Sequence, residues 1–190
     1  APMLNATDSR HNIVIKARDA FRRNGGVCGP VSIHLEKQIP VGAGLGGGSA
    51  DAAATLRGLN SISENPLRNQ RLFSLSAELG SDVPVCLSST PHQVTGTGDV
   101  IHKLKKIHAG ALLLINPLIP LSTATVFQMV SPPYNKMLPK IIDQEASIIC
   151  KLGNDLEAVS IRLVPQIADI LDRLRDSPCC VAAQMSGSGA

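Results

Sequence analysis

Apolar residues recur at intervals of three and four along much of the chain, the spacing that places them on one face of an α-helix. Glycines follow several of these stretches, as is common just beyond a helix C-terminus. Pro165 interrupts the last stretch and should divide it into two helices. The pattern predicts helices over residues 12–23, 65–79, 122–130, 137–151 and 154–175.

Other stretches alternate apolar and polar residues or are apolar throughout, as in half-buried and fully buried strands. Val31, Ile33 and Leu35 alternate with polar residues, and an apolar run precedes Pro117. These patterns predict strands over residues 30–37, 83–87, 93–95, 100–105, 109–115 and 179–185. The chain is therefore expected to be an α+β protein, with domains at 1–108 and 109–190.

A glycine-rich stretch, PVGAGLGGGSADAAATLRGLN at residues 40–60, lies between the predicted strand ending near Lys37 and an alanine-rich helix. Glycines allow close approach to a ligand, and the N-terminus of a helix directs unpaired N–H groups and a positive dipole at an anion. Ser49 is predicted as the N-cap and Asp51 as a first-turn residue that complements the dipole. Packing positions are expected at Ala52, Ala53, Ala54, Leu56 and Leu59. The stretch predicts a phosphate site.

The glycines alone leave a turn or linker open as an alternative. Two common nucleotide motifs do not fit the stretch. A Walker A loop requires a lysine, and none lies between Lys37 and Lys103. A GxGxxG loop with an acidic partner does not read convincingly either. A phosphate bound here must therefore be neutralised in another way.

Composition narrows the class of ligand. The chain has three Phe, one Tyr and no Trp, with a net charge of +3, which argues against stacking on single-stranded nucleic acid and against duplex binding. Five cysteines show no CxxC or metal-type spacing, so neither a disulfide nor structural zinc is expected. No signal segment or membrane-length apolar run is evident. A cytoplasmic protein with a small anionic ligand, and no nucleic-acid or membrane partner, is predicted.

Two glycine motifs suggest a family. The stretch PVGAGLGGGSADAA and the sequence MSGSGA at 185–190 resemble the second and third signatures of the GHMP small-molecule kinases. The segments LGSDVP at 79–84, GTGD at 96–99 and GNDLE at 153–157 resemble the branch that phosphorylates a cytidine-diphosphate-linked methylerythritol in non-mevalonate isoprenoid biosynthesis. The resemblance implies an ATP- and Mg²⁺-dependent kinase with a ribosomal-S5-like N-terminal domain, a ferredoxin-like C-terminal domain, and both ligands in the cleft between them.

The resemblance also implies site residues. Asp82 matches the catalytic aspartate, a reading that the chemistry supports, because transfer to an alcohol needs a carboxylate that orients or accepts the hydroxyl proton. Outside this context a turn or cap aspartate would be the better reading. Ser49 would help to hold a phosphate or its Mg²⁺, whose other ligands stay unassigned. Nucleotide-binding positions are Asn12, Lys37, Pro40, Val41, Gly42, Ala43, Gly44, Leu45, Gly46, Gly47, Gly48, Ser49 and Ala50.

Substrate-binding positions come from the second half of the chain. Thr123 and Phe127 match positions that line the pocket for the cytidine-bearing substrate, where a hydroxyl can hydrogen-bond and a ring can pack on the base. Ser188 and Gly189, within MSGSGA, are assigned to the substrate as well. By itself, Phe127 would more naturally be read as a core residue.

Several features depart from the family pattern. An initial strand with an AKIN-like motif, whose lysine faces the catalytic aspartate, and a GYHE-like segment are both absent, and Ala50 stands where many relatives have serine. The chain is therefore expected to be truncated at both ends. A monomer or weak homodimer is expected as a separate prediction. Two alternatives stay open: a GHMP kinase of homoserine or mevalonate type, and a nucleotide-binding module without catalysis.

Overall fold

The computed structural model describes residues 12–40, 42–96, 98, 100–104, 111–131 and 152–189. The chain divides into two compact units. The first unit comprises residues 1–41 and 46–103, and the second comprises residues 42–45 and 104–190. The glycine-rich stretch is thus shared between the units, because its residues 42–45 belong to the second unit and its helix belongs to the first.

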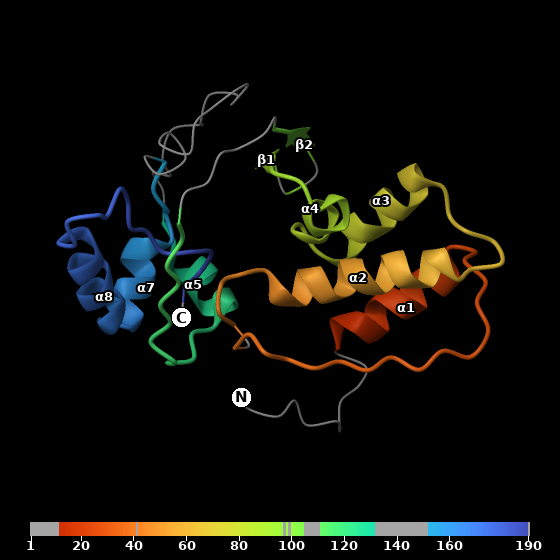
Figure 1. Cartoon of the computed structure of the whole chain (residues 1–190), viewed down its shortest axis with the longest axis horizontal. Helices are drawn as coiled ribbons and strands as arrows, with labels where there is room; N and C mark the ends of the chain where they lie inside the picture. Colours follow the sequence, from red (N-terminus) through yellow and green to blue (C-terminus); the bar gives the residue numbers. More distant parts are fainter. Residues whose placement is uncertain are drawn as a thin grey trace. The chain divides into compact units, whose positions relative to one another are not determined.

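In the part of the chain that the structure describes, the first unit contains four helices and a hairpin (Figure 1). Helix α2 packs against α1 and α4, and α3 contacts all three of these helices. The hairpin pairs β1 with β2 antiparallel, with His92 opposite Lys103 and Thr95 opposite Val100. The elements are α1 (Ile13–Arg23), α2 (Gly47–Ser61), α3 (Asn69–Leu79), α4 (Val83–Ser88), β1 (His92–Thr95) and β2 (Val100–Lys103).

The core of this unit is aliphatic apart from one aromatic ring, as the composition implies. Small alanines on α1 and α2 let the two helices approach closely around Phe21, which is fully buried. The predicted packing positions on α2 are confirmed except for Ala54, which is exposed. The core residues are Ala17, Ala20, Phe21, Ala52, Ala53, Leu56, Leu59, Leu72, Leu75 and Val83.

Within the described residues, the second unit contains three helices: α5 (Thr123–Met129), α7 (Glu157–Leu163) and α8 (Gln166–Arg175). The predicted break is confirmed, since Pro165 is the N-cap residue of α8. The core of this unit consists of Val164, Ile167, Leu171 and Met185. Met185 opens the second glycine motif, so this motif is anchored in the core. The predicted helix at 137–151 lies outside the described residues.

Four predicted strands are not formed by the described residues. Residues 30–37 run extended beside the helices (Figure 1), but only the neighbouring Val27 makes a bridge, with Asn65. Residues 111–115 of the predicted strand 109–115 and residues 179–185 are irregular. Alternation predicts an extended backbone, whereas a strand also requires a partner with which to exchange hydrogen bonds. Residues 83–87 are instead helical in α4, where Pro84 occupies the first turn that proline tolerates.

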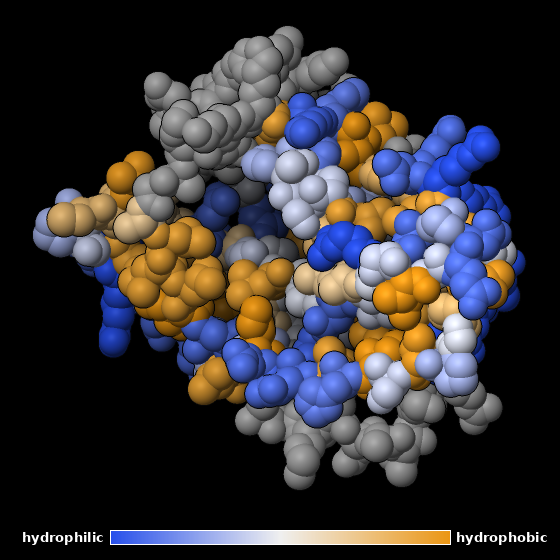
Figure 2. Space-filling model, turned by 45° about the vertical axis from the view of Figure 1, so that its right-hand side comes forward, coloured by the Kyte–Doolittle hydropathy of each residue, from blue (hydrophilic) through white to orange (hydrophobic). Residues whose placement is uncertain are grey.

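The second unit carries the most exposed apolar run of the described residues. Leu112, Leu113 and Leu114 expose 82%, 69% and 60% of their residue surface, in place of the burial predicted for a central strand. Figure 2 shows apolar residues, in orange, at the surface on the face that it presents. Among the described residues, no helix has the length and apolar character required to cross a membrane.

Candidate active site

The glycine-rich stretch ends in the N-terminus of α2. Gly46 is the N-cap, and the first hydrogen bond of the helix runs from the Ala50 N–H to the Gly46 carbonyl, 2.9 Å. The N–H groups of Gly47, Gly48 and Ser49 precede that bond, and such groups attract an anion. The predicted N-cap at Ser49 is therefore wrong, because the helix begins two residues earlier. Gly47 and Gly48 carry no side chain that could cover their N–H groups.

Lys37 lies beside this helix N-terminus. Its Nζ forms an ion pair with Oδ2 of Asp51, and a methyl group placed on Gly47 would lie 3.8 Å from the same Nζ. Asp51 lies beyond the first turn of α2, so its predicted role as a dipole-complementing residue is wrong. It instead holds a lysine close to the N–H groups of the helix. This arrangement supplies a positive charge beside the predicted phosphate site.

Asn12 has a different role in the structure. Its Oδ1 accepts a hydrogen bond from the N–H of Val14, 2.9 Å, and so caps α1. This cap confirms the predicted start of the first helix. Its assignment to the nucleotide stays a prediction.

Two glycine turns meet within the second unit. The hydroxyl of Ser186 donates to the carbonyl of Gly44, 2.8 Å. Gly44 has a positive φ of +66°, and a Cβ on it would overlap the Ser186 carbonyl oxygen and lie 3.1 Å from its carbon. A Cβ on Gly187 would likewise lie 3.0 Å from the Gly44 oxygen. Residues 142 positions apart in sequence therefore form one close-packed pair of turns.

Three side chains fix the second of these turns. Nδ2 of Asn154 donates to the carbonyls of Met185 and Gly187, at 2.9 and 2.7 Å. Oε2 of Glu157 accepts the Met185 N–H at 3.1 Å, and the buried Ser160 hydroxyl donates to the Ser188 carbonyl at 2.7 Å. None of these three residues was predicted from the sequence as a site residue. The signal was present in the GNDLE segment, which contains Asn154 and Glu157.

Two predicted substrate residues meet at this turn. Oγ1 of Thr123 and Oγ of Ser188 lie 2.8 Å apart within hydrogen-bonding distance. Phe127 follows Thr123 by one turn of α5 and exposes 61% of its surface, so it is not a core residue. The exposed ring of Phe127 and the hydroxyl of Thr123 lie on one face of α5, which is compatible with contact to a planar polar ligand.

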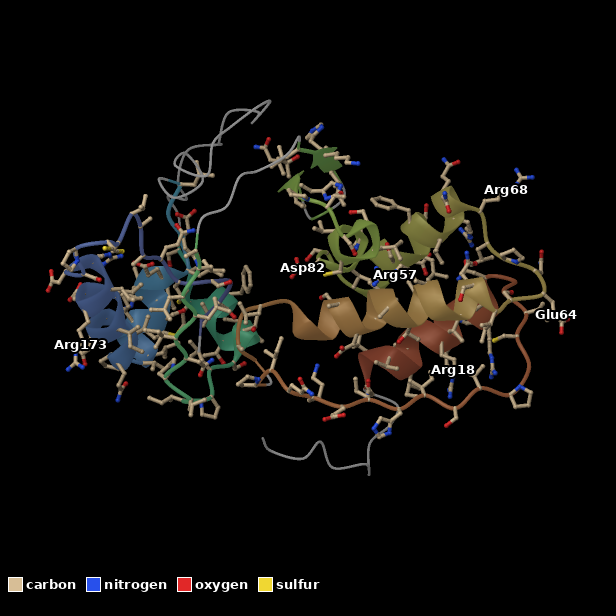
Figure 3. All side chains as sticks on the ribbon, in the orientation of Figure 1. Arg18, Arg57, Glu64, Arg68, Asp82 and Arg173 are labelled. Carbon is tan, nitrogen blue, oxygen red and sulfur yellow. The ribbon has the colours of Figure 1, made fainter. Side chains whose placement is uncertain are left out.

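Asp82 immediately precedes α4 and is exposed (Figure 3). It occupies the N-cap position, yet its side chain makes no capping hydrogen bond. The Ser81 hydroxyl donates to its Oδ1 at 3.4 Å. Buried Gly98, in the hairpin turn, packs on Ser81 so closely that a Cβ there would lie 3.0 Å from the Ser81 Cα. The turn is thus held in place while the carboxylate stays accessible.

The thiol of Cys86, whose pKa the Asp82 carboxylate affects, is not poised for reaction. Burial is the main factor that raises the pKa of Cys86 above its usual value, and the Asp82 carboxylate raises it further, against a smaller lowering by Arg57. A raised pKa keeps the thiol protonated at neutral pH, and only the thiolate is a strong nucleophile. The Cys86 thiol is therefore not a candidate nucleophile.

The predicted site residues fall into both units. Lys37, Pro40, Gly46–Ala50 and Asp82 belong to the first unit together with Asn12. Those of the second unit are Gly42, Ala43, Gly44, Leu45, Thr123, Phe127, Ser188 and Gly189. Val41 lies outside the described residues. No group of three or more His, Cys, Asp or Glu side chains in the described part of the chain could hold a metal ion.

Similarity to known proteins first indicates the class of protein to which the chain belongs. Residues 12–90 match the family model "GHMP kinases N terminal domain". This segment contains α1, the N-terminus of α2 and Asp82.

Relatives over nearly the whole chain narrow the class. The 4-diphosphocytidyl-2-C-methyl-D-erythritol kinase of Sinorhizobium medicae is 41% identical over 98% of this chain, and that of Brucella abortus is 40% identical over 95%. A crystal structure of 4-(cytidine 5'-diphospho)-2C-methyl-D-erythritol kinase is 30% identical, with a TM-score of 0.73. The match covers 96% of this chain and 68% of the chain in that structure. The chain belongs to the 4-diphosphocytidyl-2-C-methyl-D-erythritol kinase family of GHMP kinases.

The chain is shorter than these curated relatives. It spans 64% of the Sinorhizobium protein and 63% of the Brucella protein.

Proposed function

We propose that the protein transfers the γ-phosphoryl group of ATP to the 2-hydroxyl of 4-diphosphocytidyl-2-C-methyl-D-erythritol, a step of non-mevalonate isoprenoid precursor synthesis. The name of the relatives supports the substrate. One structural observation carries the reaction: Asp82 presents an accessible carboxylate, free of any capping role, in the unit that also holds Lys37 and the glycine-opened N-terminus of α2. Phosphoryl transfer needs little more than positioning and charge neutralisation.

In this proposal the N–H groups of Gly47, Gly48 and Ser49 bind phosphate oxygens, and Lys37 adds a positive charge beside them. Asp82 accepts a hydrogen bond from the substrate hydroxyl, orients it toward the γ-phosphorus atom and takes its proton as the new P–O bond forms. The bond from the γ-phosphorus to the bridging oxygen breaks at the same step, and ADP is the leaving group. Mg²⁺ would accompany the phosphates and neutralise their charge. Thr123, Phe127, Ser188 and Gly189 are proposed for the cytidine-bearing substrate.

We also infer the finer domain organisation. A ribosomal-S5-like domain at 1–108 and a ferredoxin-like domain at 109–190 are compatible with the match to a kinase of this fold. The cytoplasmic location, the monomeric or weakly dimeric state and the absence of nucleic-acid partners stay predictions.

The substrate is tested by offering competing alcohols. Protein expressed from its complete gene is incubated with Mg²⁺ and radiolabelled ATP, and with the cytidine substrate, homoserine or mevalonate in separate reactions. We expect label transfer only to the cytidine substrate. Transfer to homoserine or mevalonate would favour a different GHMP kinase, and tight ATP binding without transfer to any of the three would favour a binding module.

Replacing Lys37 should weaken ATP binding. Lys37→Met removes the charge beside the α2 N-terminus and leaves Asp51 unpaired, so that its carboxylate repels the phosphates. We expect the Kd for ATP to rise about tenfold, the order of one charge-assisted hydrogen bond. Isothermal titration calorimetry measures it, with exposed Lys103→Met as the control. The double variant with Asp51→Asn should recover part of the loss, and an unchanged Kd in Lys37→Met would remove this lysine from the site.

A further inference from the structure

The position of Asp82 depends on a helix of only six residues. At the N-terminal end of α4, Val83 and Pro84 are buried and fix the start of the helix against the core. So short a helix has little stability of its own, because most of its backbone groups belong to one end or the other. Contacts with its neighbours must therefore hold it in place.

Arg57 of α2 binds the C-terminal end of α4. Its Nη1 donates to the carbonyls of Cys86 and Leu87, at 2.8 and 3.2 Å, and lies 3.4 Å from the Ser89 hydroxyl. The last carbonyls of a helix lack helical partners, and a cation there complements the helix dipole. Figure 3 shows Arg57 and Asp82 at α4, above α2. The helix that bears the carboxylate is thus held by burial at one end and by an arginine at the other.

Helix α2, which carries Arg57, also carries the N-terminus at which the glycine-rich stretch ends. It runs without interruption from Gly47 to Ser61 and packs against α4. At about 1.5 Å per residue it spans roughly 15 Å between Gly47 and Arg57. One continuous helix, α2, therefore carries both the N–H groups proposed to bind phosphate and the Arg57 side chain that anchors α4. A shift of α4 along α2 would move Asp82 relative to those N–H groups.

We propose that Arg57 is a positioning residue for phosphoryl transfer, which anchors α4 on α2 and thereby sets the place of the Asp82 carboxylate relative to the N-terminus of α2. This inference rests on the proposed role of Asp82. Arg57 touches neither reactant; it acts through the helix it holds. Its loss should slow the transfer step and leave nucleotide binding intact, because the N–H groups and Lys37 lie at the other end of α2.

Two variants test the role in protein expressed from its complete gene. Arg57→Met keeps a long side chain without donors, and Arg57→Lys keeps the charge and one donor group. We expect kcat to fall about tenfold in Arg57→Met, since small misplacements of reacting groups are costly, with the Kd for ATP changed less than about twofold. Arg57→Lys should recover part of kcat. The control is Arg68→Met, an exposed arginine at the start of α3, which should match the wild type.

Hydrogen exchange gives a readout that does not depend on turnover. The N–H groups of Cys86 and Ser89 bond to Asp82 and Val85 within α4 and should exchange faster in Arg57→Met, while those of α1 stay protected. Faster exchange together with a lower kcat supports the proposal. Unchanged exchange of these N–H groups in Arg57→Met, or an unchanged kcat in an active enzyme, overturns this inference and leaves the proposed function standing. A wild type that binds ATP but transfers no phosphate overturns the proposed function, and the inference with it, before any variant is made.

Discussion

Asp82→Asn should abolish phosphoryl transfer while ATP remains bound. Asparagine has nearly the shape of aspartate, but its amide cannot accept the hydroxyl proton, and general-base groups contribute about 10² to 10⁴-fold to rate. We therefore expect kcat to fall by at least about a hundredfold. The fold should survive, because the Asp82 side chain makes no capping hydrogen bond that the substitution would break.

Asp169→Asn is the matched control for this change. Asp169 lies in the first turn of α8 and is exposed, so the variant removes a negative charge at a helix N-terminus as Asp82→Asn does. Each should cost about 0.3–1 kcal/mol of dipole stabilisation. Single-turnover measurement of labelled phosphate transfer, with calorimetric ATP binding, separates chemistry from binding. Full turnover in Asp82→Asn would remove this residue from the mechanism, and equal losses in both variants would point to a non-specific effect.

Apart from α4, which was predicted as a strand, the described helices were predictable because each one carries its own signal. The spacing of Ala17, Ala20 and Phe21 marks the buried face of α1, and the Asn12 cap and the Gly25-Gly26 pair mark its ends. These interactions are local, so the sequence of a segment is enough to identify them. The hairpin at residues 92–103 is similarly local, since two adjacent short segments pair across a glycine turn.

Strands and the site network depend on distant residues. Val31, Ile33 and Leu35 alternate as a strand would, but none of the described segments supplies them with a ladder. The side-chain amide of Asn154 donates to a backbone carbonyl in a turn more than thirty residues further along the chain. The sequence alone does not show that these two groups meet. The glycine motifs predicted positions at which the backbone must approach another group closely. For Gly44 this group is Ser186, which belongs to the other glycine motif.

Gly44→Ala should disrupt that contact and weaken the second unit. A methyl group at Gly44 would overlap the Ser186 carbonyl oxygen, which also accepts the Gly189 N–H at 3.2 Å. The positive φ adds about 1–2 kcal/mol for any residue with a side chain, and a steric overlap in packed backbone adds about 1–3 kcal/mol. We expect a loss of about 3 kcal/mol in the free energy of unfolding, together with faster exchange of the Gly189 N–H.

Gly153→Ala separates the two causes. Gly153 lies in the same unit with nearly the same φ, +70°, yet nothing lies within 4 Å of a Cβ placed there. It should therefore lose only the conformational share, about 1 kcal/mol. Urea unfolding gives the free energies, and hydrogen exchange reports the turn itself. Equal losses of unfolding free energy in the two variants would mean that the backbone at the Gly44–Ser186 contact relaxes with no energetic penalty. A larger loss in Gly44→Ala, with Gly189 exchange raised only there, would mean that the second glycine turn keeps its shape because the first one is packed against it.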